Sequence, residues 1–281
     1  MAVAHPLDGY LRTDRIPTMW CPGCGLGIVL GTLLRAVDRR IREGSLRREN
    51  VGFAGGIGCT ARMTLYPLFD SAHVIHGRAI PFALAVKVVK PEMKMIVVGG
   101  DGDIAAIGGN HILHAIRRNA DLMVVMVNNM IYGMTGGQQA PTTPKGLYTT
   151  TTPYGNPERA INMVKLAEAL GANYVARGSV THPQLLEQFF YRALGKRGLA
   201  FVEVISTCPE LFGRHIGFRS PTDLYMEIRK RVIVKAKPSV EESDYSWEKG
   251  FVIGEFLERD EPGFVDTIYE YLNKIQRGGS R

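Results

Sequence analysis

Residues 95–103 of the chain read MIVVGGDGD, a short apolar run that leads into a loop of glycine and aspartate. Such a run of β-branched residues is typical of a strand that is buried on both faces of a parallel sheet. A helical pattern follows over residues 104–118, and a second apolar run occupies residues 122–127. The segment therefore predicts a strand–helix–strand unit, with the glycine-rich loop at the carboxyl end of its first strand.

The same alternation continues in both directions along the chain. Further helices are expected at 28–37, 80–89, 159–170 and 184–194, and further strands at 51–54, 73–76, 174–177 and 200–205. This order predicts an α/β fold, a parallel sheet with helices on both faces. We expect that domain to span residues 1–210. Residues 211–281 have a less regular pattern and are expected to form a C-terminal extension that packs on a partner subunit, with a closing helix at 264–275.

The composition of the 281-residue chain is that of an ordinary globular protein, with 45% hydrophobic and 22% charged residues. Its apolar runs are too short to span a bilayer, and residues 1–15 lack the apolar core of a signal peptide. We therefore expect a cytoplasmic protein with no membrane partner. The net charge is +7, but the arginine clusters have no aromatic residues between them, so no nucleic acid partner is expected. An acidic protein partner would suit this charge.

Polar residues follow two neighbouring strands of the predicted sheet. The Gly100-Asp101-Gly102 loop follows the strand at 95–98, and Asn129 follows the strand at 122–127. A carboxylate, an amide oxygen and a loop carbonyl are suitable ligands for Mg²⁺, and the glycines with the following helix N-terminus could approach a phosphate. The alternative is that Asp101-Gly102 forms a hairpin turn. The helical pattern after the loop favours a site for a metal and a diphosphate.

The chain contains four cysteines, Cys21, Cys24, Cys59 and Cys208. Four is the ligand number of a 4Fe-4S cluster and also of a structural zinc ion. Zinc ribbons usually carry two C-x-x-C pairs, whereas this chain has one, so the spacing favours a cluster and leaves zinc as the alternative. A disulfide is not expected in a cytoplasmic protein, and a redox-active C-x-x-C would leave two of the cysteines unexplained.

Taken together, the motifs between residues 20 and 213 resemble those of the beta subunits of 2-oxoacid:ferredoxin oxidoreductases. The resemblance rests on WCPGCG at 20–25, GIGC at 56–59, HGRA at 76–79, GDGD at 100–103, the segment 128–138 and STCP at 206–209. It implies a thiamine-diphosphate-binding domain of the PP type. It also implies that the cysteines hold a 4Fe-4S cluster, and that Asp101, the side chain of Asn129 and the carbonyl of Ile131 bind Mg²⁺. The residues expected to bind cofactors are Gly58, Cys59, His76, Gly77, Arg78, Gly100, Asp101, Gly102, Asp103, Asn129, Ile131, Tyr132, Gly133, Met134 and Thr135.

Two further residues are expected to act on the substrate. His76 follows a predicted strand, where an imidazole could contact a phosphate or transfer a proton. Arg62 lies three residues after Cys59 and could hold a substrate carboxylate, although a surface role is the alternative. Both residues are therefore candidates for catalytic roles.

The resemblance implies a coenzyme A-dependent oxidative decarboxylation of a 2-oxoacid, with coenzyme A as co-substrate and electrons passed through the cluster to ferredoxin. Arg62 and residues 208–214 resemble the 2-oxoglutarate branch. The expected partners are an alpha subunit, which would supply the carboxylate that activates thiamine, and ferredoxin. The alternatives are a pyruvate or branched-chain 2-oxoacid oxidoreductase subunit, a non-oxidative thiamine-diphosphate decarboxylase or carboligase, and a basic zinc-binding module.

Overall fold

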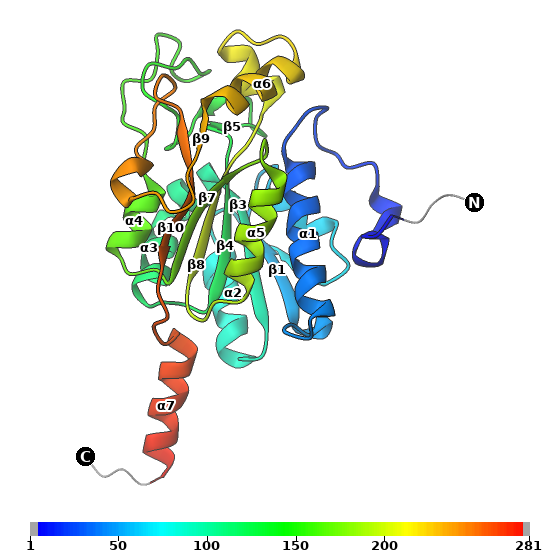
Figure 1. The fold of residues 1–281 in the computed structure, drawn as a ribbon, viewed down its shortest axis with the longest axis vertical. Coiled ribbons are helices and arrows are strands. Elements are labelled where there is room, and N and C mark those ends of the chain that lie inside the picture. Colours follow the sequence, from blue (N-terminus) through cyan, green and yellow to red (C-terminus); the bar gives the residue numbers. More distant parts are fainter. Residues whose placement is uncertain (1–4, 278–281) are drawn as a thin grey trace.

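The computed structural model describes residues 5–277 and is built around one eight-stranded sheet with the order β2-β1-β3-β4-β8-β7-β10-β9 (Figure 1). Every neighbouring pair of strands is parallel except β7 and β10, which are antiparallel. The strands are β1 Val51–Gly55, β2 Asp70–His73, β3 Lys94–Gly100, β4 Leu122–Asn128, β7 Tyr174–Ser179, β8 Ala200–Ile205, β9 Val232–Val234 and β10 Phe251–Glu258. A small hairpin pairs β5 Ile131–Tyr132 with β6 Gln138–Gln139.

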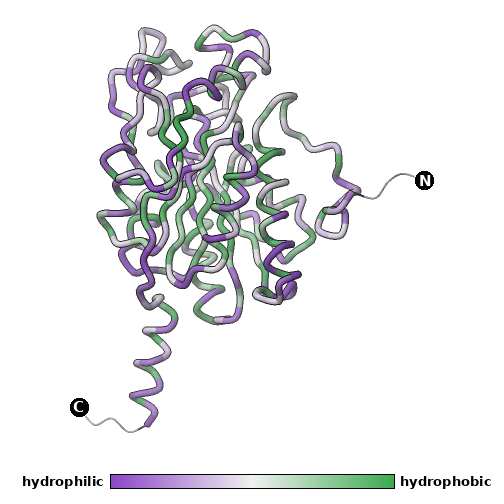
Figure 2. Tube along the Cα trace, in the orientation of Figure 1, coloured by the Kyte–Doolittle hydropathy of each residue, from purple (hydrophilic) through white to green (hydrophobic). Residues whose placement is uncertain are grey.

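Helices cover both faces of the sheet, as the sequence predicts. The helices α1 Leu26–Arg42 and α5 Pro183–Leu194 pack in one core, and α2 Ala79–Val89, α3 Gly109–Arg117 and α4 Met163–Ala169 pack in a second core on the other face. β3 and β4 contribute alternate side chains to the two cores, because successive side chains of a strand point to opposite faces. Figure 2 shows the hydrophobic residues gathered along the central strands. The predicted α/β fold class is confirmed.

Three predicted elements differ from those observed. The strand expected at 73–76 lies earlier, as the mostly exposed edge strand β2, because the chain turns at Gly77 with a φ of +72° before α2 begins. The helix expected at 104–118 is divided into a π-helical segment, Gly102–Ile107, and α3. The helix expected at 159–170 begins at Met163, because the side chain of Asn162 accepts hydrogen bonds from the first-turn amides of Val164 and Lys165.

Residues after 210 take part in the same sheet. They form α6 Pro221–Arg231, β9, β10 and α7 Phe264–Gln276, and β10 covers β7 on the side away from β8. The α7 helix projects from the end of the sheet opposite α6 (Figure 1). The extension proposed from the sequence thus supplies two strands, and the division of the chain at residue 210 stays a prediction. In the part of the chain that the structure describes, no helix combines the length and apolar character needed to cross a bilayer.

Candidate functional site

The two loops predicted to carry the site meet at the carboxyl edge of the sheet. β3 and β4 pair in parallel, with Gly100 opposite Val127, so the residues that follow them lie side by side. A pocket opens at this edge, which we call the diphosphate pocket after the ligand expected from the sequence. Its lining consists of Ile57, Gly58, Cys59, Thr60, His76, Gly100, Asp101, Gly102, Asn129, Ile131, Tyr132, Gly133, Met134 and Thr135.

Most residues expected to bind a cofactor line this one pocket. Gly77, Arg78 and Asp103 do not line it, whereas Ile57 and Thr60, which were not among the expected residues, do. Ile57 lies within the GIGC motif and Thr60 directly follows it. Their position in that loop is the feature of the sequence that could have predicted their place in the pocket. The guanidinium of Arg78 instead donates to backbone carbonyls, at 3.3 Å for that of Ile107.

Asp101 is buried at the floor of the site and is held by three neutral donors. Its Oδ1 accepts from the Gly102 amide at 2.9 Å, and its Oδ2 accepts from the Met130 amide at 2.9 Å and the Thr142 hydroxyl at 2.5 Å. Burial raises the pKa of Asp101 to about 6. A bound divalent cation would favour the ionised form, because it supplies the positive charge that the protein donors lack.

The turn after β4 brings the other two proposed metal ligands to the same pocket. Met130 has a φ of +64°, the left-handed conformation that residues other than glycine rarely adopt. The side chain of Asn129 precedes this residue and the carbonyl of Ile131 follows it, and both residues line the diphosphate pocket. The amide of Met130 donates to Asp101, so the turn and the carboxylate are fixed to each other.

Asp103 anchors the loops around the pocket instead of lining it. Its side chain is 1% exposed, and its Oδ1 accepts from the amides of Ile57 at 3.2 Å and Gly77 at 2.7 Å. The same oxygen lies 2.5 Å from Nδ1 of His76. This contact fixes the imidazole ring and leaves Nε2 as the ring nitrogen for another partner.

The glycine of the loop allows an aromatic ring to approach the backbone. A Cβ atom on Gly102 would lie 2.2 Å from the ring of Tyr132, so no side chain fits at this position. The Tyr132 ring also meets His76 edge to face, with ring centroids 6.5 Å apart. These contacts explain why the loop between β3 and the following helix requires glycine at position 102.

The four cysteines line a second pocket, which we call the cysteine pocket. Its lining consists of Met19, Trp20, Cys21, Cys24, Leu26, Cys59, Arg62, Asn129, Gly133, Cys208, Pro209, Glu210 and Leu211. Backbone and side-chain contacts join the segments that carry the thiols: the Trp20 indole donates to the Cys59 carbonyl at 2.8 Å, and the Thr207 hydroxyl donates to the Gly23 carbonyl at 2.9 Å. The fold therefore brings the four cysteines together from three distant parts of the chain.

All four thiols are free, and three of them are partly shielded from solvent. Burial raises the pKa of Cys24 to about 12 and also raises the pKa values of Cys59 and Cys208. Thiolates at these positions would need a metal centre to stabilise them. Among residues 5–277, no three His, Cys, Asp or Glu side chains are grouped so that they could hold a single metal ion.

Arg62 lies beside the cysteines and not in the diphosphate pocket. Its side chain is exposed, and its Nη1 lies 3.0 Å from the sulfur of Met19. Its positive charge acts to lower the pKa of Cys59, although burial outweighs it. The two pockets nevertheless share Cys59, Asn129 and Gly133 in their linings. These three residues therefore lie between the pocket that Arg62 lines and the diphosphate pocket.

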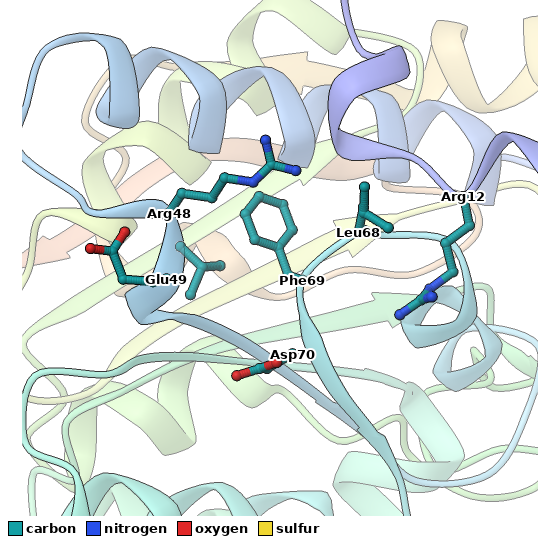
Figure 3. Close-up of a pocket in the computed structure, with 7 residues that line it drawn as sticks. Arg12, Arg48, Glu49, Leu68, Phe69 and Asp70 are labelled. Atoms are coloured by element: carbon teal, nitrogen blue, oxygen red, sulfur yellow. The ribbon is translucent and has the colours of Figure 1, made fainter.

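A third, open pocket lies at the amino end of β1 (Figure 3). Its lining includes two arginines, Arg12 and Arg48, and two acidic residues, Glu49 and Asp70, so the formal charges of the lining sum to zero. The Arg48 guanidinium lies over the ring of Phe69, 5.7 Å from its centroid, and donates to the Gly9 carbonyl. These contacts attach the N-terminal segment to the sheet, and we assign this pocket no chemistry.

Comparison with known proteins agrees with this geometry. Residues 56–204 match the family model described as thiamine pyrophosphate enzyme, C-terminal TPP binding domain, which defines the class of protein. A 2-oxoglutarate synthase subunit KorB from Methanocaldococcus jannaschii is 42% identical over 97% of this chain and 99% of its own length. The subunit of the same name from Archaeoglobus fulgidus is 44% identical over 94% of this chain and 95% of its own.

A solved structure extends the similarity to the whole fold. The 2-oxoglutarate:ferredoxin oxidoreductase from Magnetococcus marinus, with 2-oxoglutarate, coenzyme A and succinyl-CoA bound, matches with a TM-score of 0.83 at 28% identity, covering 98% of this chain and 92% of that chain. The chain belongs to the family of 2-oxoacid:ferredoxin oxidoreductase beta subunits, among which its relatives of nearly equal length are 2-oxoglutarate synthase subunits.

Proposed function

We propose that this chain is the subunit of a 2-oxoglutarate:ferredoxin oxidoreductase that binds thiamine diphosphate, Mg²⁺ and a 4Fe-4S cluster. The observation that carries the proposal is the shared wall between the diphosphate pocket and the cysteine pocket, formed by Cys59, Asn129 and Gly133. Oxidative decarboxylation needs a site of carbon chemistry next to a site that removes electrons, and the two pockets meet this requirement.

The residues of the diphosphate pocket fit the proposed cofactor and its metal. Asp101, the Asn129 side chain and the Ile131 carbonyl would supply oxygen ligands to Mg²⁺, which prefers such ligands. At Gly102 the absence of a side chain makes room for the ring of Tyr132, and both residues line the pocket. Since Asp101 is buried with neutral donors only, a cation at this position is the missing partner of its charge.

The cysteine pocket fits a cluster by its donors. Four thiols around one cavity are the usual ligands of a 4Fe-4S cluster. When bound, thiamine diphosphate supplies the carbon nucleophile and the electron sink for loss of CO₂, while the cluster accepts electrons singly and coenzyme A takes the acyl group.

The side chains of this subunit would bind and orient the reactants. His76, with Nδ1 held by Asp103, presents Nε2 as the atom that could hold or move a proton at the pocket. Arg62 would bind a carboxylate of the substrate from the cysteine side. These roles, together with the cofactor contacts expected of Gly77 and Arg78, are proposals that substitutions can test.

The partners follow from the family and from the openness of the site. The beta subunit of such an oxidoreductase works with an alpha subunit, which we propose covers the diphosphate pocket and supplies the activating carboxylate. Ferredoxin is the proposed electron acceptor, and the basic surface of the chain would suit an acidic partner. A cytoplasmic location would keep the thiols reduced.

The decisive experiment purifies the chain with its alpha subunit under anaerobic conditions. The complex should contain iron and acid-labile sulfide, and it should reduce a viologen dye when 2-oxoglutarate, coenzyme A, Mg²⁺ and thiamine diphosphate are present. A Cys208→Ser variant should lose iron and viologen reduction. Zinc in place of iron would contradict the cluster assignment. Release of CO₂ without dye reduction would identify a non-oxidative enzyme. Faster turnover of pyruvate than of 2-oxoglutarate would contradict the substrate assignment.

A further inference from the structure

The turn that carries the proposed metal ligands depends on hydrogen bonds from outside it. Its central residue, Met130, is fully buried in the left-handed conformation, which is unfavourable for a residue with a side chain. Three neighbours hold it there. Oδ2 of Asp101 and Oδ1 of Asn128 accept from its amide at 2.9 and 3.1 Å, and the Thr143 hydroxyl donates to its carbonyl at 2.7 Å.

A second set of contacts fixes these neighbours from the long loop after β6. The buried Thr142 donates its hydroxyl to Asp101 at 2.5 Å, and its carbonyl accepts from the hydroxyl of Tyr245 at 3.1 Å. The Nδ2 of Asn128 lies 3.4 Å from the same tyrosine oxygen. The hydroxyl of Tyr245 therefore contacts both Thr142 and Asn128. Asp101 and Met130 thus rest on one connected network.

The network ends in a buried ion pair of the sheet. Glu203 accepts from Asn128 Nδ2 at 2.7 Å and from Arg177 Nε at 2.7 Å, and the side chains of Glu203 and Arg177 are both fully buried. Arg177 also donates to the carbonyl of Ser243 at 2.8 Å, two residues before Tyr245. The segment that carries Tyr245 is therefore tied to the sheet on the side of β7 and β8.

We propose that Thr142 and Tyr245 are positioning residues for the metal-binding turn, and that through Tyr245 the segment after residue 240 organises the diphosphate pocket. Neither residue lines that pocket, so each acts through Asp101 or Asn128. The inference deepens the proposed function and rests on it, since the ligand of the organised turn is Mg²⁺ with thiamine diphosphate.

The test measures binding of Mg²⁺ and thiamine diphosphate to the cofactor-depleted complex by calorimetry, with the thermal midpoint of the same samples. Loss of the Thr142 hydroxyl in Thr142→Val, or of both contacts of the Tyr245 hydroxyl in Tyr245→Phe, should weaken cofactor binding roughly five- to tenfold. Thr142→Ser keeps the hydroxyl and should bind as the wild type does. Tyr174→Phe is the matched control, because Tyr174 is fully buried and donates to Glu255 at 2.6 Å at the far end of the sheet.

The outcomes distinguish failure of the inference from failure of the proposed function. Wild-type affinity in both Tyr245→Phe and Thr142→Val would overturn the inference while leaving the proposed function intact. An equal loss of affinity in Thr142→Ser and Thr142→Val would overturn it as well, because the hydroxyl would then not be the cause. A wild-type complex that does not bind thiamine diphosphate would overturn the proposed function and the inference with it.

Discussion

Asp101 accepts three hydrogen bonds from neutral donors, and both of its oxygens take part. The variant Asp101→Asn keeps the shape, removes the charge and replaces one acceptor oxygen with an amide nitrogen that cannot accept. We predict that it weakens Mg²⁺-dependent binding of thiamine diphosphate by at least about tenfold, because a metal ligand and a counter-charge are lost together. Calorimetric titration of the cofactor-depleted complex measures the change.

The matched control is Asp121→Asn. Asp121 is also a buried carboxylate that accepts from backbone amides, those of Gly198 and Val265, but it lies at the amino end of β4. Its substitution should affect stability and leave cofactor affinity unchanged. Equal affinity in Asp101→Asn and the wild type would remove Asp101 from the metal site.

Arg62 provides a prediction about substrate choice. Because 2-oxoglutarate has a second carboxylate and pyruvate does not, loss of the guanidinium should penalise the first substrate selectively. In Arg62→Leu we expect the ratio of kcat/KM for 2-oxoglutarate over pyruvate to fall by about tenfold. Arg15→Leu, an exposed arginine that donates to the Leu65 carbonyl, serves as the control. An unchanged ratio would assign Arg62 a role at the cysteines only.

At the scale of single elements, α4 shows how one side chain sets a boundary. Asn162 caps the helix through two amides and donates from Nδ2 to Ser243 at 2.9 Å and Asp244 at 2.8 Å. Asn162→Ala should lower the free energy of unfolding by about 1–2 kcal/mol, because the helix cap and the two side-chain contacts are lost together. Urea denaturation monitored by circular dichroism gives the value. A loss below the error of that measurement would show that solvent replaces the cap.

The central elements could be predicted because their signals are local. β3 and β4 are short apolar runs, and Gly100, Asp101 and Asn129 follow them directly, so the side-by-side position of the site residues follows from parallel pairing. The edge strand β2 was misplaced because it has no buried pattern to detect. The break at Gly108 was also missed, since the apolar spacing continues across it.

Other parts of the site depend on contacts between distant residues. Asp103 follows the glycine loop, yet its role is to anchor His76 and Ile57, which approach from another loop. Thr142 and Tyr245 are separated by more than a hundred residues from each other, and no spacing rule connects them. Such contacts depend on tertiary packing, which a single sequence does not show.

At the scale of the whole molecule, the residues that we propose to bind the diphosphate and its metal gather at one edge of one sheet. We predict that the purified, cluster-loaded chain does not reduce a viologen dye with 2-oxoglutarate and coenzyme A. The pyrimidine ring of the cofactor needs a carboxylate of its own, and the one carboxylate in the pocket lining among residues 5–277, Asp101, is assigned to Mg²⁺. Addition of the alpha subunit should restore turnover. Full activity of the chain alone would show that it supplies this group itself.

The position of β10 has a consequence for synthesis of the protein. β10 covers the edge of β7, but its residues leave the ribosome long after those of β7, so the growing chain carries an uncovered strand edge for much of its synthesis. Until then Tyr245 also lacks its contact with the ring of Phe251 in β10, whose centroid lies 5.4 Å away. Stalled nascent chains that end before residue 251 should therefore be cut readily by protease, and chains released there should aggregate through the exposed β7 edge. β10, the last strand to be synthesised, is therefore the strand that protects the β7 edge from aggregation.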